Sequence, residues 1–199
     1  MKGRVLMALL GLYVVLVAGT QDPILKDFDF AKFSGLWYEI AFAVKLEPQG
    51  SPPKETKVGA VVVELEDSHL ALTAAYEDEG RCMKEKSQAL KGDVPGKFKI
   101  PKKAGTKEVL VLATDYKTYA IMDIVFHNEG AAHRVLKLYS RTLEIKEEVM
   151  KRFHEVAGEY GLSGKDMYLL TWDRRRAKLL KEVSLALGCA EPPKLSLPT

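Results

Sequence analysis

The sequence contains few of the residues that hold metal ions or support catalysis. It has two cysteines and four histidines, and the histidines lie far apart along the chain. Zinc ligands usually occur in closely spaced pairs, so no metal site is predicted. No serine-histidine-aspartate arrangement and no phosphate-binding glycine loop is evident. We therefore expect neither enzymatic activity nor a cofactor.

The sequence also lacks a long apolar run beyond its N-terminal segment. Residues 5–18 are uncharged, follow Lys2 and Arg4, and lead into small residues, a pattern typical of a secretory signal peptide. The run is shorter than the roughly 20 apolar residues that a membrane span needs. We predict a signal peptide over residues 1–19, secretion to the extracellular space and no stable insertion into a membrane.

No charge of one sign dominates, because 30 basic residues face 27 acidic ones. Lys2 and Arg4 of the predicted signal peptide account for two of the basic residues. Proteins that bind nucleic acid in general present a basic face to the phosphates, so nucleic acid is not an expected partner.

The scarcity of cysteine still permits one bridge. Cys82 and Cys189 lie in a chain predicted to reach an oxidising compartment, which favours a disulfide between them, with two free thiols as the alternative. Such a bridge would close a long loop, which in the chain-entropy model stabilises the folded state by up to about 4.7 kcal/mol.

Short segments with the character of β-strands make up most of the remaining chain. They are separated by turn-rich pieces and occur at residues 36–44, 57–66, 70–76, 82–90, 97–100, 108–114, 119–126 and 135–141, with a ninth at 167–170. Regular spacing of this kind predicts an antiparallel sandwich or barrel. The longest link, residues 47–54, is rich in proline and is a candidate lid.

One helix interrupts the strands. Its apolar residues recur at helical spacing, at Val149, Phe153, Val156, Ala157 and Tyr160. Acidic residues occupy its first turns, where they complement the helix dipole, and Gly161 can end it. We expect this helix to pack on the outside of the sheet.

The chain divides into three parts by this interpretation: the signal peptide 1–19, a barrel domain 20–173 and a C-terminal extension 174–199. The extension begins Arg174-Arg175-Arg176 and has apolar residues at helical spacing. A peripheral segment held by Cys189 is the favoured interpretation, and a basic helix for a membrane surface or a partner is the alternative.

Side chains alternate between the inside and the outside of a β-barrel, and eight strands leave room for one small ligand. This alternation turns Tyr76, Ala113 and Val135 inward and Asp123 outward. The residues predicted to contact a ligand are Leu70, Leu72, Ala74, Phe98, Ile100, Val109, Val111, Ala120, Met122, Ile124, Lys137 and Tyr139.

Lys137 is the one charged residue among them. An ammonium group in an apolar cavity is unfavourable unless it is paired, so Lys137 is a candidate partner for a ligand carboxylate. The alternatives are that it lies solvated near a rim or that the strand is shifted by one residue, which would reverse its faces. Glu39 also faces inward in this interpretation, with no assigned role.

Three separated segments resemble conserved features of the lipocalin family. Gly35-Leu36-Trp37-Tyr38 is similar to the family's Gly-x-Trp segment, Thr114-Asp115-Tyr116 to its turn between the sixth and seventh strands, and Arg141 to the arginine after the eighth. The resemblance implies an all-β fold, an eight-stranded antiparallel up-and-down β-barrel with one C-terminal α-helix outside. It also implies that Gly35, Trp37, Thr114, Asp115, Tyr116 and Arg141 form the closed base.

Longer stretches are similar to family members that carry retinoic acid in male reproductive fluid. This resemblance implies a small hydrophobic ligand, a retinoid such as retinoic acid, for a secreted carrier. An odorant, pheromone or other lipid is the alternative ligand, and a role in defence is less favoured. We expect a monomer that can be accepted by a cell-surface receptor. The family's disulfide ends just past the ninth strand, whereas Cys189 lies farther along this chain.

Overall fold

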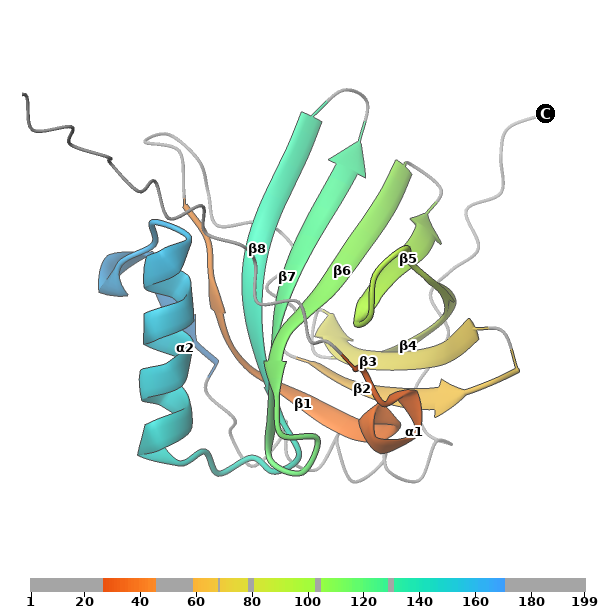
Figure 1. Cartoon of the computed structure of the whole chain (residues 1–199), viewed down its shortest axis with the longest axis horizontal. Coiled ribbons are helices and arrows are strands. Elements are labelled where there is room, and N and C mark those ends of the chain that lie inside the picture. The colour runs from red at the N-terminus through yellow and green to blue at the C-terminus, as the bar shows by residue number, and fades with distance from the viewer. Residues whose placement is uncertain are drawn as a thin grey trace, which may run out of the picture.

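The computed structural model describes residues 27–45, 59–67, 69–78, 81–102, 105–128 and 131–170. Within these ranges the chain is mostly β-strand, with one longer helix after the eighth strand (Figure 1). In chain order the elements are α1 (Phe30–Phe33), β1 (Gly35–Ala43), β2 (Gly59–Leu65), β3 (His69–Asp78), β4 (Arg81–Lys91), β5 (Lys97–Lys102), β6 (Gly105–Thr114), β7 (Tyr119–Asn128), β8 (Ala131–Ser140), α2 (Glu147–Glu159), a short 3₁₀ helix (Gly164–Asp166) and β9 (Met167–Leu169).

The first eight strands form a closed antiparallel barrel. Each strand from β2 to β7 pairs with the next along the chain, β8 pairs with β1, and the β1–β2 pairing closes the ring. Tyr38 marks the closure, because it lies opposite Ala60 of β2 and Ser140 of β8. β9 adds to β1 outside the ring. The predicted up-and-down barrel with a helix outside it is therefore confirmed.

Two β-bulges shift the inward and outward alternation. In β1 the register with β8 moves between Glu39 and Ala41, so Trp37, Glu39 and Phe42 all face the interior. In β6 the register with β7 moves between Val111 and Ala113. Ala113 consequently packs on the outer face of the sheet, and the prediction that it shares a face with Val109 and Val111 was wrong. An extra residue in one strand reverses the faces beyond it.

The sheet has separate apolar layers on its two faces. The inner layer lies inside the barrel and includes Trp37 at the end near α1. The outer layer lies between β1, β6, β7, β8 and α2, whose Phe153 and Ala157 are fully buried there. Helical spacing gives α2 this single apolar stripe. Gly161, at a positive φ of 73°, follows its last turn, as the sequence predicted.

A short helix that the sequence did not predict lies below the barrel. α1 has four residues, and the Asp29 side chain caps it by accepting a hydrogen bond from the Lys32 N–H. Its Phe30 and Phe33 join Phe28 and Phe98 in a cluster of rings with centroids 5.0–6.3 Å apart. Four residues are too few for a helical period to show in the sequence.

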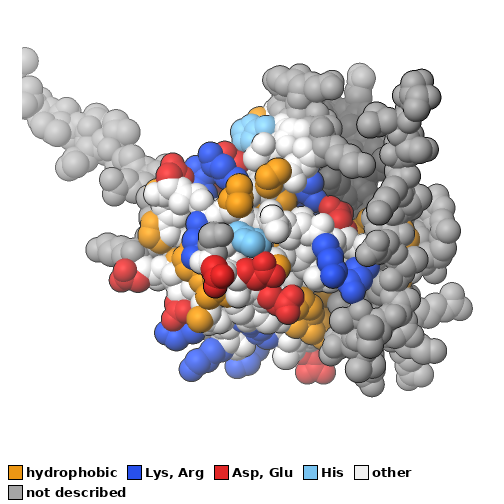
Figure 2. Space-filling view, turned by 90° about the vertical axis from the view of Figure 1, so that its right-hand side faces the viewer, with side chains coloured by type: hydrophobic (Ala, Val, Ile, Leu, Met, Phe, Trp, Pro, Cys, Tyr) orange, Lys and Arg blue, Asp and Glu red, His pale blue; other side chains and the backbone are white. Residues whose placement is uncertain are grey.

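The charged side chains of the surface are mixed in sign. On the face shown in Figure 2, acidic and basic residues are interspersed rather than gathered into one patch. In the part of the chain that the structure describes, no helix is long and apolar enough to cross a membrane. The predicted signal peptide, the candidate lid and the C-terminal extension lie outside the described residues.

Candidate ligand-binding site

A cavity of about 300 Å³ occupies the barrel interior. Pockets for small molecules begin at about this volume. Its wall is mainly apolar and comes from β1 to β8, with Phe33 of α1 beside it. The apolar lining consists of Phe33, Ala60, Val61, Val63, Leu70, Leu72, Ala74, Ala75, Tyr76, Ala89, Phe98, Ile100, Val109, Met122, Ile124, Phe126 and Tyr139.

Most of the residues predicted from strand alternation lie together on this wall. They are Leu70, Leu72, Ala74, Phe98, Ile100, Val109, Met122, Ile124, Lys137 and Tyr139. Val111 and Ala120 face the same interior but are completely buried in the apolar layer around Trp37 rather than lining the cavity. Val135 also belongs to that layer.

Several lining residues were not assigned from the sequence. β4 contributes Glu85, Ser87 and Ala89, which lie opposite Ala74, Leu72 and Leu70 of β3. The two faces of β4 are both largely polar, so its sequence carries little signal for which face is inside. The inner face of β4 can be inferred only from its pairing with β3, whose apolar residues alternate clearly.

Lys137 faces the cavity and is paired with a residue of the protein itself. Its side chain is 10% exposed and that of Glu39 6%. The Lys137 Nζ lies 3.0 Å from Glu39 Oε1 and donates a hydrogen bond of 3.1 Å to Oε2. The Tyr139 hydroxyl donates a longer one, 3.5 Å, to the same Oε2. The inward orientation matches the predicted alternation, and Glu39 meets the need for a counter-charge; recognition of a ligand carboxylate by Lys137 stays a prediction.

A second charged group lies at the end of the barrel opposite α1, which we call the mouth. Here Lys102 of β5 contacts Glu85 at 2.5 Å, and both side chains are about 40% exposed. Lys107 of β6 lies nearby in the lining, with its Nζ 5.2 Å from the centre of the Phe126 ring. Exposure to solvent and proximity to the β5–β6 turn distinguish this mouth group from the buried pair of Glu39 and Lys137.

The opposite end is sealed by Trp37 and Arg141. The guanidinium carbon lies 3.6 Å from the centre of the fully buried indole, a cation–π contact. The guanidinium also donates hydrogen bonds of 2.9 Å to the carbonyls of Lys32, Ser34 and Leu36. Gly35 permits this approach, because it has a φ of 104° and a Cβ there would lie 3.0 Å from the arginine. The structure thus brings the two residues together as the resemblance implied.

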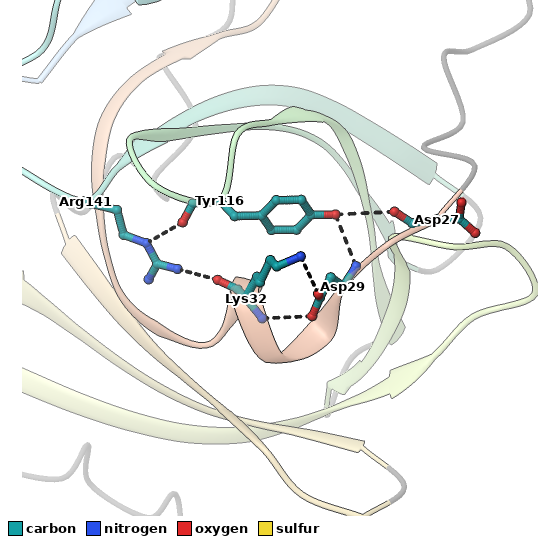
Figure 3. A network of polar contacts seen from close by, with 5 residues as sticks. All are labelled: Asp27, Asp29, Lys32, Tyr116 and Arg141. Atoms are coloured by element: carbon teal, nitrogen blue, oxygen red, sulfur yellow. Dashed lines mark hydrogen bonds and ion pairs between the residues drawn. The ribbon is translucent and has the colours of Figure 1, made fainter.

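Tyr116 of the Thr114-Asp115-Tyr116 turn connects Arg141 with the segment before α1 (Figure 3). Arg141 donates to the Tyr116 carbonyl, and the Tyr116 hydroxyl accepts a hydrogen bond from the Asp29 N–H before α1. Burial opposes ionisation of Asp115, but hydrogen bonds from Thr118, Tyr119 and Lys117 outweigh it and lower the pKa of this carboxyl.

Other sequence-derived candidates lie outside this site. Cys82 is half-buried on β4, and Cys189 lies beyond the described residues, so the bridge between them stays a prediction. Within the described ranges no three histidine, cysteine, aspartate or glutamate residues gather as metal ligands would. Asp123 lies on the outer face, as expected, but is buried there and ion-paired with Arg134 at 3.2 Å.

Known proteins share both the sequence and the fold. The model of the lipocalin / cytosolic fatty-acid binding protein family matches residues 34–173. Epididymal-specific lipocalin-5 of Rattus norvegicus is 48% identical over 177 residues, which are 89% of this chain and 94% of that protein. The Mus musculus lipocalin-5 is 46% identical over 173 residues, 87% of this chain and 90% of that protein.

A more distant relative and a solved structure agree with these matches. Epididymal-specific lipocalin-8 of Homo sapiens is 34% identical over 170 residues, 85% of this chain and 91% of that protein. The structure described as "The Siderocalin Ex-FABP functions through dual ligand specificities" is similar with a TM-score of 0.60. Its sequence identity is 23%, and the similarity covers 71% of this chain and 91% of that one, which is evidence for the fold alone.

Proposed function

Because the chain belongs to the lipocalin / cytosolic fatty-acid binding protein family, we propose that it carries a retinoid such as retinoic acid in its barrel. Membership of this family makes the protein a binding protein for small hydrophobic molecules and not an enzyme. The identity of the ligand is the proposed part. The observation that carries it is a largely apolar cavity inside the barrel with charged groups at two separate depths.

The apolar wall supports binding of a hydrocarbon body. Transfer of apolar surface from water into such a cavity is favourable by about 25 cal/mol per Å². A retinoid offers a long polyene chain and a bulky ring for this transfer, with one polar end to be oriented. The strands supply few polar groups along the wall, so the hydrocarbon part can lie against it without unpaired hydrogen-bonding atoms.

The charges of the lining favour an acid with its carboxylate at the mouth. Among the described lining residues are three lysines and two glutamates, and two of the lysines, Lys102 and Lys107, lie at the mouth with Glu85. Deeper in the cavity Glu39 balances Lys137, so that level is neutral. An anion is therefore attracted more strongly to the mouth than to the interior.

We further propose that the protein acts outside the cell. The predicted signal peptide and the predicted Cys82–Cys189 bridge both suit an oxidising, extracellular compartment. In this view a monomeric carrier delivers its ligand to a cell-surface receptor.

Quenching of tryptophan fluorescence on titration with retinoic acid and with retinol tests the ligand. We expect saturable binding of both, with the acid binding about tenfold tighter, equivalent to about 1.4 kcal/mol. Replacing Lys107 with Met should remove most of that difference, because it removes one of the two lysine charges at the mouth. The matched control is Lys117→Met, an exposed lysine in the turn at the closed end.

Two results would contradict this proposal. If neither retinoid binds, the ligand class is excluded. Mass spectrometry of the molecule extracted from the secreted protein would then identify an odorant or other lipid. Equal affinities for acid and alcohol in the unmodified protein would exclude the role of the mouth charges.

A further inference from the structure

The buried group formed by Glu39, Lys137 and Tyr139 lies deep in the cavity, close to its sealed end. Glu39 is two residues beyond Trp37 in β1, and Tyr139 is two residues before Arg141 in β8. Glu39 and Tyr139 are direct partners across the β1–β8 pairing. All three side chains line the cavity, and we call them the deep polar group.

The barrel does not need this group in order to be closed. Trp37, Arg141 and the phenylalanine rings seal the end below it. Moving two charges from water into an apolar interior is unfavourable, and apolar side chains of similar volume often serve stability equally well. A buried pair on the wall of a cavity is therefore best explained by what it offers to the cavity's occupant.

The deep polar group offers hydrogen bonds without a net charge. The ammonium of Lys137 has three N–H donors, and its contacts with Glu39 involve the two oxygens of one carboxylate. A second carboxylate placed here would lie beside the Glu39 carboxylate and be repelled, so this proposal replaces the expectation that Lys137 pairs with a ligand carboxylate. A ketone can instead accept from Lys137, and a hydroxyl can in addition donate to Glu39.

We propose that Glu39, Lys137 and Tyr139 bind an uncharged oxygen, a ketone or hydroxyl, at the buried end of the ligand. This inference rests on the proposed function, which places the acidic end of the ligand at the mouth. Together they describe an apolar acid that also carries oxygen at its far end, such as a retinoic acid oxidised on its ring.

The test compares retinoic acid with 4-oxoretinoic acid, which differs by one ketone on the ring. We expect the unmodified protein to bind the ketone about tenfold more tightly, the effect of one good hydrogen bond in a buried site. The double variant Glu39→Gln with Lys137→Met should bind both acids within about twofold of each other. Changing both partners avoids leaving one charge buried alone, which would endanger folding.

The mouth supplies a matched control. The double variant Glu85→Gln with Lys102→Met removes an ion pair of the same composition at the other level of the cavity. It should keep the tenfold preference for the ketone, because the deep polar group is unchanged in this variant. Circular dichroism and the unfolding midpoint of each variant establish that the barrel remains folded.

The outcomes separate this inference from the proposed function. Two results would contradict the proposed role of the deep polar group and leave retinoid binding intact. One is equal binding of the two acids by the unmodified protein, and the other is a preference for the ketone that remains in the Glu39→Gln, Lys137→Met variant. If no retinoid binds, the same ratios are measured with dodecanoic acid and 12-hydroxydodecanoic acid. Absence of a preference for the hydroxylated acid would then overturn the inference as well.

Discussion

At the level of single residues, the closed end of the barrel depends on a guanidinium that serves several partners at once. Arg141 covers the face of Trp37 and donates to main-chain carbonyls before and within the Gly-x-Trp segment. These carbonyls lie in α1 and at the entry to β1. A planar group with five N–H donors can satisfy them together, whereas an ammonium acts as a single point.

Replacing Arg141 with Lys should therefore destabilise the protein although the charge is retained. We expect a loss of about 2–3 kcal/mol in the free energy of unfolding, because several partly buried carbonyls lose a charged donor together. Urea denaturation followed by tryptophan fluorescence measures the loss. The same change at Arg152, an exposed residue of α2 paired with Glu155, should alter stability by less than about 0.5 kcal/mol. Equal effects at the two positions would contradict the role of the guanidinium.

The residue pattern of the strand predicted that Lys137 faces the interior but did not predict its ion pair with Glu39. Alternation along one strand is local information, and it turned Lys137 and Glu39 toward the interior correctly. Their pairing depends on the register between β1 and β8, which join segments 98 residues apart in the chain. That register is set by barrel closure and by the bulge after Glu39, neither of which has a local sequence pattern.

At the level of elements, long regular patterns were predictable and local irregularities were not. Most of the strands follow a period of two residues and α2 a period of 3.6, and each of these elements overlaps the range predicted for it. The bulge in β6 moved Ala113 to the outer face, and α1 was too short to show a period. The β6 bulge and α1 both lie near the sealed end, where the backbone departs from regular strand geometry.

The turn between β6 and β7 should make the closed end sensitive to acid. Its Asp115 carboxylate accepts hydrogen bonds from three main-chain N–H groups, and its pKa is lowered in the folded state. A carboxyl with a depressed folded pKa stabilises the protein fully above its unfolded value of about 3.9, and the stabilisation disappears as the pH falls through the folded value.

The measurement is the free energy of unfolding of the unmodified protein and of Asp115→Asn between pH 7 and pH 3. The unmodified protein should be the more stable at neutral pH, and the difference should shrink below about pH 4 as Asp115 becomes protonated. A difference that stayed constant over this range would show that the charge of Asp115 does not support the turn.

At the level of the whole molecule, the barrel has a packed core at one end and a cavity beside it. Trp37, Arg141 and the aromatic cluster fill the end near α1, and α2 buries a second apolar layer outside. The cavity above the sealed end leaves apolar side chains such as Leu72 and Ile124 with incomplete packing. An occupant that fills this space supplies the missing contacts, so ligand binding and stability should be coupled.

Saturation with a bound ligand should thus stabilise the whole barrel. At a free concentration of about 100 times the Kd, a ligand that binds only the folded state adds about 2.7 kcal/mol to the free energy of unfolding. Replacing Ala74 with Phe fills part of the cavity from β3 and should reduce this gain to below about 0.5 kcal/mol, while the ligand-free variant remains folded. The control is Ala132→Phe, which places the same ring on the exposed surface of β8 and should leave the full gain. Urea denaturation with and without retinoic acid gives both values, and an undiminished gain in Ala74→Phe would show that the ligand binds elsewhere than in the barrel.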